Sequence, residues 1–203
     1  MERELLKKKL MRKAISYLSR YASSSHKLTV ILRRYGTKKL SNSQPNEVNS
    51  SIIATVDKCL SLGYLNDSSF ATTQAQTYRR LGRSENAIRR KLLEHQIDDE
   101  TINSALKIAD NASNDGELLA ALRFSRRRRI GPFSPEEAKK ITNKDFSNCA
   151  DKKHRFERKK RDIAILSRAG FRSDVCLKIV KLTSISFAEE MIVQIETHGF
   201  IAD

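Results

Sequence analysis

Four consecutive arginines, Arg126–Arg129, have the clearest chemistry in this 203-residue sequence. Arginine presents a planar fork of hydrogen-bond donors that fits phosphate and carboxylate groups. Successive residues of a helix turn by about 100°, so four arginines surround the helix instead of sharing one face. The alternative interpretation is that this charge complements the macrodipole at a helix C-terminus. One or two arginines would serve that purpose, so we expect Arg126–Arg129, with Arg123 one turn earlier, to contact an anionic partner.

Two further groups of basic residues are candidate contacts. The segment 152–161 surrounds a narrow apolar stripe with cations that only Glu157 and Asp162 balance. A solvated charged face is the alternative for this segment. Its candidate residues are Lys152, Lys153, Arg155, Arg158, Lys159, Lys160 and Arg161. The weaker candidates, which lie in a net acidic stretch, are Arg79, Arg80, Arg83, Arg89, Arg90 and Lys91.

The charge of the whole chain supports a polyanionic partner. The formal net charge is +15, and it is concentrated in residues 1–40 and 121–161, each with a net charge of +10. Such blocks favour polyanions or acidic protein surfaces. The tyrosines fall mostly on apolar stripes and are predicted to be buried, so no base-stacking platform is evident. We therefore expect contacts with phosphate or acidic side chains and no reading of bases. These tyrosines are Tyr17, Tyr21, Tyr35, Tyr64 and Tyr78.

The sequence indicates no catalytic site. It lacks a GxxxxGK phosphate loop, a GxGxxG motif and an HExxH motif, and its histidines are isolated. The cysteines Cys59, Cys149 and Cys176 have neither zinc-ligand spacing nor an even count. We predict no catalytic residues, no metal and no cofactor. The charged N-terminal segment and the absence of long apolar runs predict a cytoplasmic protein without membrane contact.

Apolar residues recur at helical spacing almost throughout, and this predicts an all-α fold. Few Gly and Pro residues remain for the turns of a β fold: 7 and 3, respectively. We expect Gly36 to end a helix, the stretch 41–50 to be a loop, and a capping box of Ser186 and Glu189 to start the last helix. The other predicted helix caps are one of Ser23, Ser24 and Ser25, then Asp67, Ser84, Asp98 and Ser173.

An internal repeat organises these helices. Three basic helices place Leu32, Leu92 and Leu166 in one register, each four residues before Gly36, Gln96 and Gly170. We predict three tandem three-helix repeats that form a curved elongated array, and we expect a monomer. The predicted boundaries are 1–66, 67–112 and 113–182, with an insertion at about 131–151 and a C-terminal helical extension over 183–203.

One segment and its neighbours resemble a known family. Gly63-Tyr64-Leu65-Asn66-Asp67 is followed by Phe70-Ala71, then by Gly82, and later by the arginine run and Gly170-Phe171. Over roughly residues 10–182 this pattern resembles the RecX family, regulators of the RecA recombinase. The resemblance implies three helical repeats and a protein, not an enzyme, that binds RecA filaments on DNA. It implies limited filament growth and inhibited strand exchange, ATP hydrolysis and coprotease activity. Gln96 departs from the family, which usually has Gly there.

Three functions are therefore open. The first is a modulator of the RecA filament that also contacts single- and double-stranded DNA through phosphates. The second is a general DNA-binding helical protein or helix-turn-helix regulator, although no recognition helix rich in Asn, Gln and Arg stands apart. The third is a small enzyme such as a nuclease, for which the sequence places no set of carboxylates.

Overall fold

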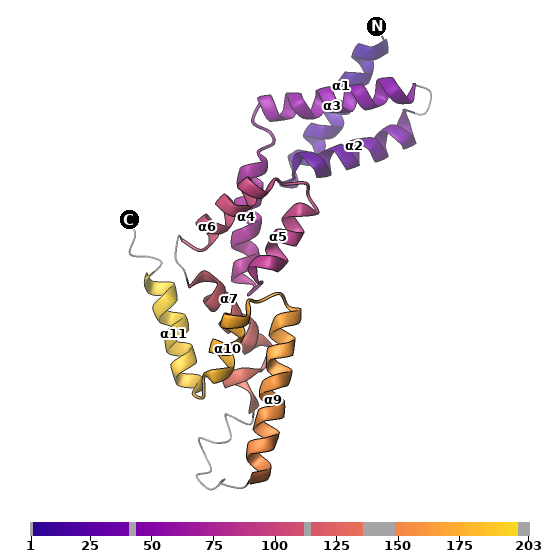
Figure 1. The fold of residues 1–203 in the computed structure, drawn as a ribbon. Helices are drawn as coiled ribbons and strands as arrows, with labels where there is room; N and C mark the ends of the chain where they lie inside the picture. Colours follow the sequence, from indigo (N-terminus) through magenta and orange to yellow (C-terminus); the bar gives the residue numbers. More distant parts are fainter. Residues whose placement is uncertain (1, 41–43, 112–114, 136–148, 199–203) are drawn as a thin grey trace. The chain divides into compact units, whose positions relative to one another are not determined.

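The computed structural model describes residues 2–40, 44–111, 115–135 and 149–198, and every regular element in these ranges is a helix (Figure 1). The prediction of an all-α fold is thus confirmed. The helices are α1 (Glu2–Leu18), α2 (Ser25–Lys39), α3 (Pro45–Ser61), α4 (Asp67–Arg80), α5 (Glu85–Leu93), α6 (Asp99–Ala109), α7 (Gly116–Arg128), the 3-10 helix η1 (Gly131–Phe133), α9 (Cys149–Arg168), α10 (Ser173–Lys181) and α11 (Ile185–His198).

The chain packs as two compact units. The first contains the residues up to Thr73 together with Leu92–Ile102, and the second contains Gln74–Lys91 together with the residues from Asn103 onward. The helices α4, α5 and α6 each contribute to both units. This division concerns packing and not sequence similarity, so the three tandem repeats and their boundaries stay a prediction.

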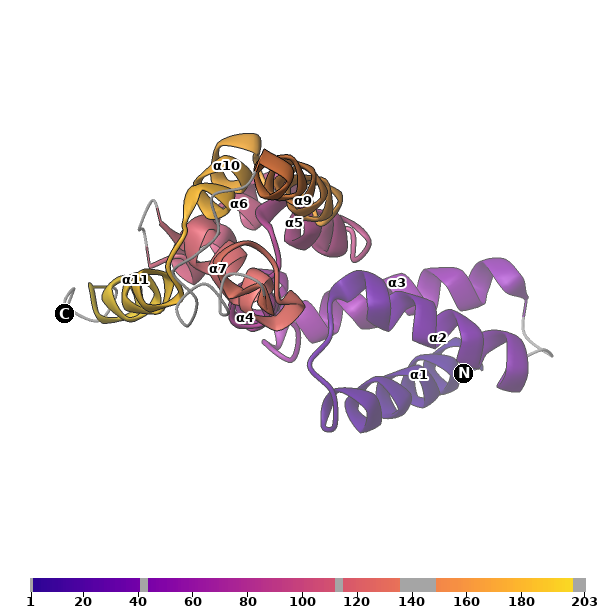
Figure 2. The same cartoon turned by 90° about the horizontal axis from the view of Figure 1, so that it is seen from below.

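The core of the first unit lies between α1, α2 and α3, which run beside one another in both views (Figures 1 and 2). Its buried side chains recur every three or four residues, because that spacing places them on one face of each helix. Tyr21 and Tyr64, which were predicted to be buried, are exposed. The buried set is Leu6, Leu10, Ala14, Leu28, Leu32, Leu40, Val48, Ile52, Val56, Cys59 and Leu65.

Gly36 does not end its helix, and the predicted loop over 41–50 is wrong from Pro45 onward. Helix α2 continues to Lys39, and α3 begins at Pro45. Proline suits the first turn of a helix, where its missing N–H costs nothing. Gly36 is buried where a Cβ atom would lie 2.9 Å from Val48 Cγ1. Its role is therefore the close approach of α2 and α3.

Three of the predicted N-caps are confirmed by hydrogen bonds. The Ser24 hydroxyl accepts from Lys27 N at 3.2 Å, Ser84 accepts from Ala87 N at 3.3 Å, and the Asp98 carboxylate accepts from Thr101 N at 2.8 Å. These bonds satisfy amide groups that a helix leaves without an internal partner in its first turn. The Thr101 amide and hydroxyl also hold the pKa of Asp98 below its ordinary value.

Three other predicted caps are wrong. Helix α4 is capped by Asn66, whose side chain accepts from Ser69 N at 2.8 Å, and Asp67 instead accepts from the N–H and hydroxyl of Ser25. Helix α11 begins after Ser184, which accepts from Phe187 N at 3.3 Å, so no Ser186–Glu189 capping box forms. Ser173 is already inside α10, whose N-cap Arg172 makes no side-chain cap bond.

Several helices end in the same left-handed turn. A residue one to three positions after the end of the helix has a positive φ, and the next N–H donates to the carbonyl five residues before it, as in Ile97 N to Leu92 O and Phe171 N to Leu166 O, both 3.2 Å. Gly170 has φ 89° and Gln96 has φ 55°. Glycine adopts this region without the strain that a Cβ atom brings. Gln96 thus shares the conformation of Gly170, whereas Gly36 lies within a helix and does not.

The core of the second unit surrounds α7, against which α10 and α11 pack, while α9 packs on α10. The rings of Phe124 and Phe171 meet edge to face at 5.4 Å between centroids. The buried set is Leu118, Ala120, Ala121, Leu122, Phe124, Ile130, Leu166, Phe171, Val175, Cys176, Ile179, Val180, Ala188 and Ile192. This core holds the C-terminal end of α7 and the basic helix α9, which carry the main candidate contacts.

Candidate polyanion-binding surface

The four arginines at the end of α7 are all exposed. Arg129 has φ 55° and ψ 48° and forms the left-handed C-cap, so the run turns away from the helix axis at its end. The guanidinium carbons of Arg127 and Arg128 lie 5.8 and 5.9 Å from the ring centroid of the buried Phe124. A cation over an aromatic face is attracted to it. The ring of Phe124 thereby helps to fix the positive charges of Arg127 and Arg128 at the surface.

Arg123 and Arg127 are partly engaged within the second unit. Arg123 Nη2 donates to Glu196 Oε1 of α11 at 2.7 Å, and Arg127 Nη1 donates to Leu81 O at 2.6 Å. Arg126 lies 3.8 Å from Glu189, and both of these side chains are at least half exposed. Such exposed pairs contribute little to stability. Arg123 therefore connects α7 to α11 and Arg127 contacts the residue after α4, while Arg126, Arg128 and Arg129 are exposed.

Helix α9 carries the second basic block. Lys153, Arg155, Lys160 and Arg161 are exposed, and Lys160 Nζ lies 4.5 Å from the ring centroid of Phe156. Phe156, on the predicted apolar stripe, is 57% exposed, so only the C-terminal part of the stripe is buried. The backbone of Lys152 belongs to α9, but its side chain lies outside the described residues.

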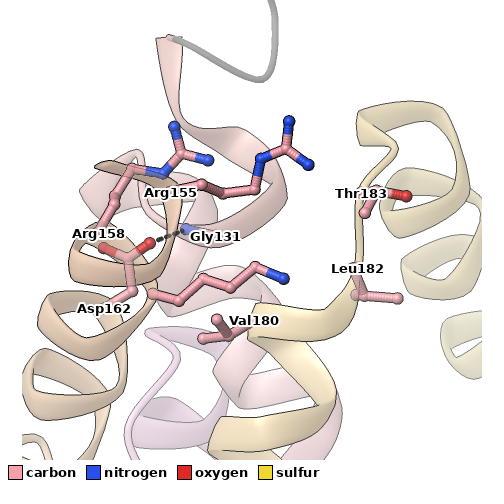
Figure 3. Close-up of a pocket in the computed structure, with 8 residues that line it drawn as sticks. Gly131, Arg155, Arg158, Asp162, Val180, Leu182 and Thr183 are labelled. Atoms are coloured by element: carbon pink, nitrogen blue, oxygen red, sulfur yellow. Dashed lines mark hydrogen bonds between the residues drawn. The ribbon is translucent and has the colours of Figure 1, made fainter. Parts of the chain in front are cut away.

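Part of this block converges on a small pocket (Figure 3). Arg155, Arg158 and Lys159 line it together with Asp162 of the same helix. Asp162 is buried, and its Oδ2 accepts from Gly131 N at 2.9 Å. Because Gly131 follows the arginine run by two residues, this bond joins the end of the first block to the second. The structure thus ties the segment just after the first block to the helix that carries the second.

The third, weaker cluster is divided by the fold. Arg80, Arg83, Arg90 and Lys91 are exposed. Arg89 is half-buried and donates to Asn103 at 2.6 Å. Their sequence neighbour Arg79 is buried.

Arg79 lies in the interior of the second unit with two carboxylates. Its Nη1 lies 2.5 Å from Glu117 Oε2, and its Nη2 and Nε lie 2.8 and 2.7 Å from the Asp110 carboxylate. The side chain is 5% exposed. Burial lowers the pKa of Arg79, but the hydrogen bonds and charges of both carboxylates outweigh burial and raise it. Burial also raises the pKa of Asp110, against the opposing effect of Arg79. This placement argues against Arg79 as a surface contact.

The sequence interpretation missed the residues that position this surface. Asp162 was noted only as a balancing charge, and neither Gly131 as its partner nor Glu117 and Asp110 as partners of Arg79 were anticipated. A usable signal existed for Asp162, because it follows Arg158 by four residues and Lys159 by three, and these spacings share a helix face. No comparable signal links Arg79 to acids more than 30 residues away.

Within the described ranges, no group of three or more His, Cys, Asp or Glu side chains is placed to hold a metal ion. None of the helices in those ranges is long and apolar enough to cross a membrane. Cys59 and Cys176 are buried free thiols, and burial raises the pKa of both.

The fold and this surface define an all-helical protein with a basic face at its C-terminal unit. The chain is 32% identical to the regulatory protein RecX of Myxococcus xanthus (strain DK1622) over 169 residues, which are 82% of this chain and 81% of that protein. No family model matches the chain. An identity of this extent shows the family: the chain belongs to the RecX family of regulatory proteins.

Proposed function

We propose that this protein binds the RecA–DNA filament and limits its growth, recombination, ATP hydrolysis and coprotease activity. The observation that carries the proposal is the identity with a regulatory protein RecX along most of both chains. A RecA–DNA filament combines DNA phosphates with a protein surface, so a basic helical protein has two kinds of anionic group to contact. The proposed role is regulatory and not enzymatic, and it belongs in the cytoplasm.

The exposed basic blocks are the proposed contacts. Arg126 and Arg128 on α7, and Lys153 and Lys160 on α9, project from a folded core without being needed in it. Their chemistry suits phosphates of single- or double-stranded DNA and acidic side chains equally. We expect this binding to be independent of base sequence. The tandem repeats and a monomeric state belong to the same proposal.

The deciding experiment measures the single-strand-dependent ATPase of the cognate RecA with increasing amounts of this protein. Inhibition at or below a stoichiometric amount supports the proposal. An unchanged ATPase at stoichiometric protein refutes it. Adding the protein before and after filament assembly separates an effect on growth from an effect on the completed filament.

Two charge-reversed variants divide the surface between its partners. One carries Arg126→Glu and Arg128→Glu, and the matched variant carries Lys153→Glu and Lys160→Glu, so that both lose the same charge. Each is assayed for DNA binding and for RecA inhibition. Loss of DNA binding with intact inhibition assigns that block to phosphate, and the opposite pattern assigns it to RecA. If neither variant changes either property, the basic face is not the contact surface.

A general DNA-binding regulator is the second candidate, favoured only by the basic charge. It predicts a consensus sequence when the protein selects from random duplexes. A recovered consensus together with an unaffected RecA would replace the RecA proposal. Cleavage of DNA in the presence of a divalent metal would favour a nuclease instead.

A further inference from the structure

The pocket between α9 and the segment after α10 is lined mainly by charged groups (Figure 3). Four of its side chains come from one helix at positions 155, 158, 159 and 162. Residues three, four and seven apart lie on the same face of a helix, so α9 directs all four to one side. Among the described residues, the pocket is lined by Gly131, Arg155, Arg158, Lys159, Asp162, Val180, Leu182 and Thr183.

The opposite wall is fixed in place by the backbone. Gly131 has φ 59°, and a Cβ atom there would lie 3.2 Å from Ile179 Cγ2. Its N–H donates to the buried carboxylate of Asp162, which is 6% exposed. This hydrogen bond connects η1 to α9 within the lining of the pocket. The basic side chains therefore face a wall that packing and one buried hydrogen bond hold in position.

The described lining of the pocket carries more positive than negative charge. Arg155, Arg158 and Lys159 bring three positive charges and Asp162 brings one negative charge, a formal net charge of +2 for these residues. Asp162 accepts from Gly131 N and is buried, whereas Arg155 is exposed. Such a lining favours an anion of similar charge over a neutral or cationic group.

The pocket has room for part of an anion. Its volume is about 30 Å³, which is more than one water-sized group needs. One oxygen of a tetrahedral anion therefore fits this space. Arginine pairs with phosphate through two parallel hydrogen bonds, and lysine adds a point charge.

We propose that this pocket binds one phosphate group of a nucleic acid backbone, with Arg155, Arg158 and Lys159 as its ligands. Asp162 is a positioning residue, since it orients Gly131 and the helix face but repels the anion itself. The inference rests on the proposed function, because it makes α9 the site that meets DNA in the filament. Inorganic phosphate has the same chemistry as a backbone phosphate. The experiment therefore has one arm for inorganic phosphate and one for nucleic acid.

The first arm follows the backbone amide resonance of Gly131 by NMR while inorganic phosphate is added to the full-length protein. A saturable shift that exceeds the shift of exposed amides elsewhere is expected, because an anion beside Arg155 and Lys159 alters the Asp162–Gly131 bond. An unmoved Gly131 resonance overturns the proposal.

The second arm measures the binding of a short oligo-dT strand over a range of salt concentrations. Arg155→Gln and Lys159→Gln each remove one pocket cation, and Arg161→Gln removes the same charge from an exposed position of α9 outside the pocket. Each phosphate contact adds about 0.7 to the log–log salt slope for single strands. We expect each pocket variant to lose a slope of about 0.7 and Arg161→Gln to lose clearly less.

Equal losses in all three variants would overturn the pocket and indicate a diffuse basic face. A phosphate shift at Gly131 with no loss of salt slope in either pocket variant would overturn the nucleic acid source and leave free phosphate as the ligand. Arg155 is exposed, so Arg155→Gln keeps the test valid if Lys159→Gln fails to fold. RecA inhibition by the unaltered protein is scored separately, so that failure of the pocket and failure of the RecA proposal are distinguished.

Discussion

Replacement of Arg79 by alanine tests whether this arginine is a structural or a contact residue. Its guanidinium is surrounded by Asp110 and Glu117, whose side chains are 17% and 6% exposed. It makes three short contacts with them and also donates to Arg83 O at 3.2 Å. The substitution removes this cation and leaves two carboxylates in a largely dry interior, where charge without a compensating charge is costly. Glu117 keeps its hydrogen bond from Glu85 N.

The expected loss is a large part of the total stability. Removing one partner of a buried ion pair costs about 3–5 kcal/mol, whereas a small domain has about 5–15 kcal/mol in total. With a urea m-value of about 2 kcal/mol/M, the unfolding midpoint falls by about 2 M. Far-ultraviolet circular dichroism during urea titration measures this change. Hydrogen exchange of the amides of α7 locates it in the second unit.

The matched control is Arg80→Ala, one residue further along α4. Arg80 is exposed, and we expect its loss to change the free energy of unfolding by no more than about 0.5 kcal/mol. A third variant carries Arg79→Met with Asp110→Asn and Glu117→Gln, and it should recover at least half of the loss, because no charge remains buried. If Arg79→Ala unfolds like the unaltered protein but loses partner binding, the structural role is refuted and Arg79 is a contact residue.

Three further predictions concern single positions. Gln96→Gly should raise the free energy of unfolding, measured by urea titration, by about 0.5–1 kcal/mol. Glycine relieves the left-handed strain at φ 55°, and its greater freedom in the unfolded chain offsets part of that gain. An unchanged or lower free energy of unfolding contradicts this prediction. The lowered pKa of Asp98 means that its carboxylate stabilises the fold at neutral pH, and that this contribution disappears as the pH falls through the lowered value. The stability difference between the unaltered protein and Asp98→Asn should therefore shrink in strong acid, and a pH-independent difference refutes the assignment. Arg123→Gln should increase hydrogen exchange of the α11 amides, because it breaks the 2.7 Å pair with Glu196. Adding Glu196→Gln to that variant should increase the exchange little further. Equal exchange in the unaltered protein and in Arg123→Gln contradicts this role of Arg123.

Local features of the fold were predictable from the sequence. Ser24, Ser84 and Asp98 cap helices as expected, because a cap depends on a side chain and an amide only three residues away. Most of the buried faces followed from spacing for the same reason, although Tyr21, Tyr64 and Phe156 are exposed. The sequence also placed Gln96 and Gly170 at equivalent positions, and both have left-handed backbones.

Features that depend on distant residues were not predictable. Gly36 and Gly170 occupy equivalent positions in the sequence repeat, but they are glycine for different reasons. Val48 approaches too closely for a Cβ atom at Gly36, whereas Gly170 has a left-handed backbone after a helix. Asp67 has the residue type and the position of an N-cap for α4. Its carboxylate instead accepts hydrogen bonds from the N–H and hydroxyl of Ser25, 42 residues away. Arg79 and Arg80 are neighbours of one type, and the first is buried with Asp110, which follows α6, and with Glu117 of α7, both more than 30 residues away.

Growth of labelled RecA on single-stranded DNA tests the central claim most directly. Filament length is followed by fluorescence after nucleation, with and without this protein at a concentration below that of RecA. The account predicts that net growth slows or stops, and that a variant reversed at Arg126 and Arg128 or at Lys153 and Lys160 restores it at least in part. Filaments that extend at the same rate with and without the protein would contradict a regulatory action on RecA.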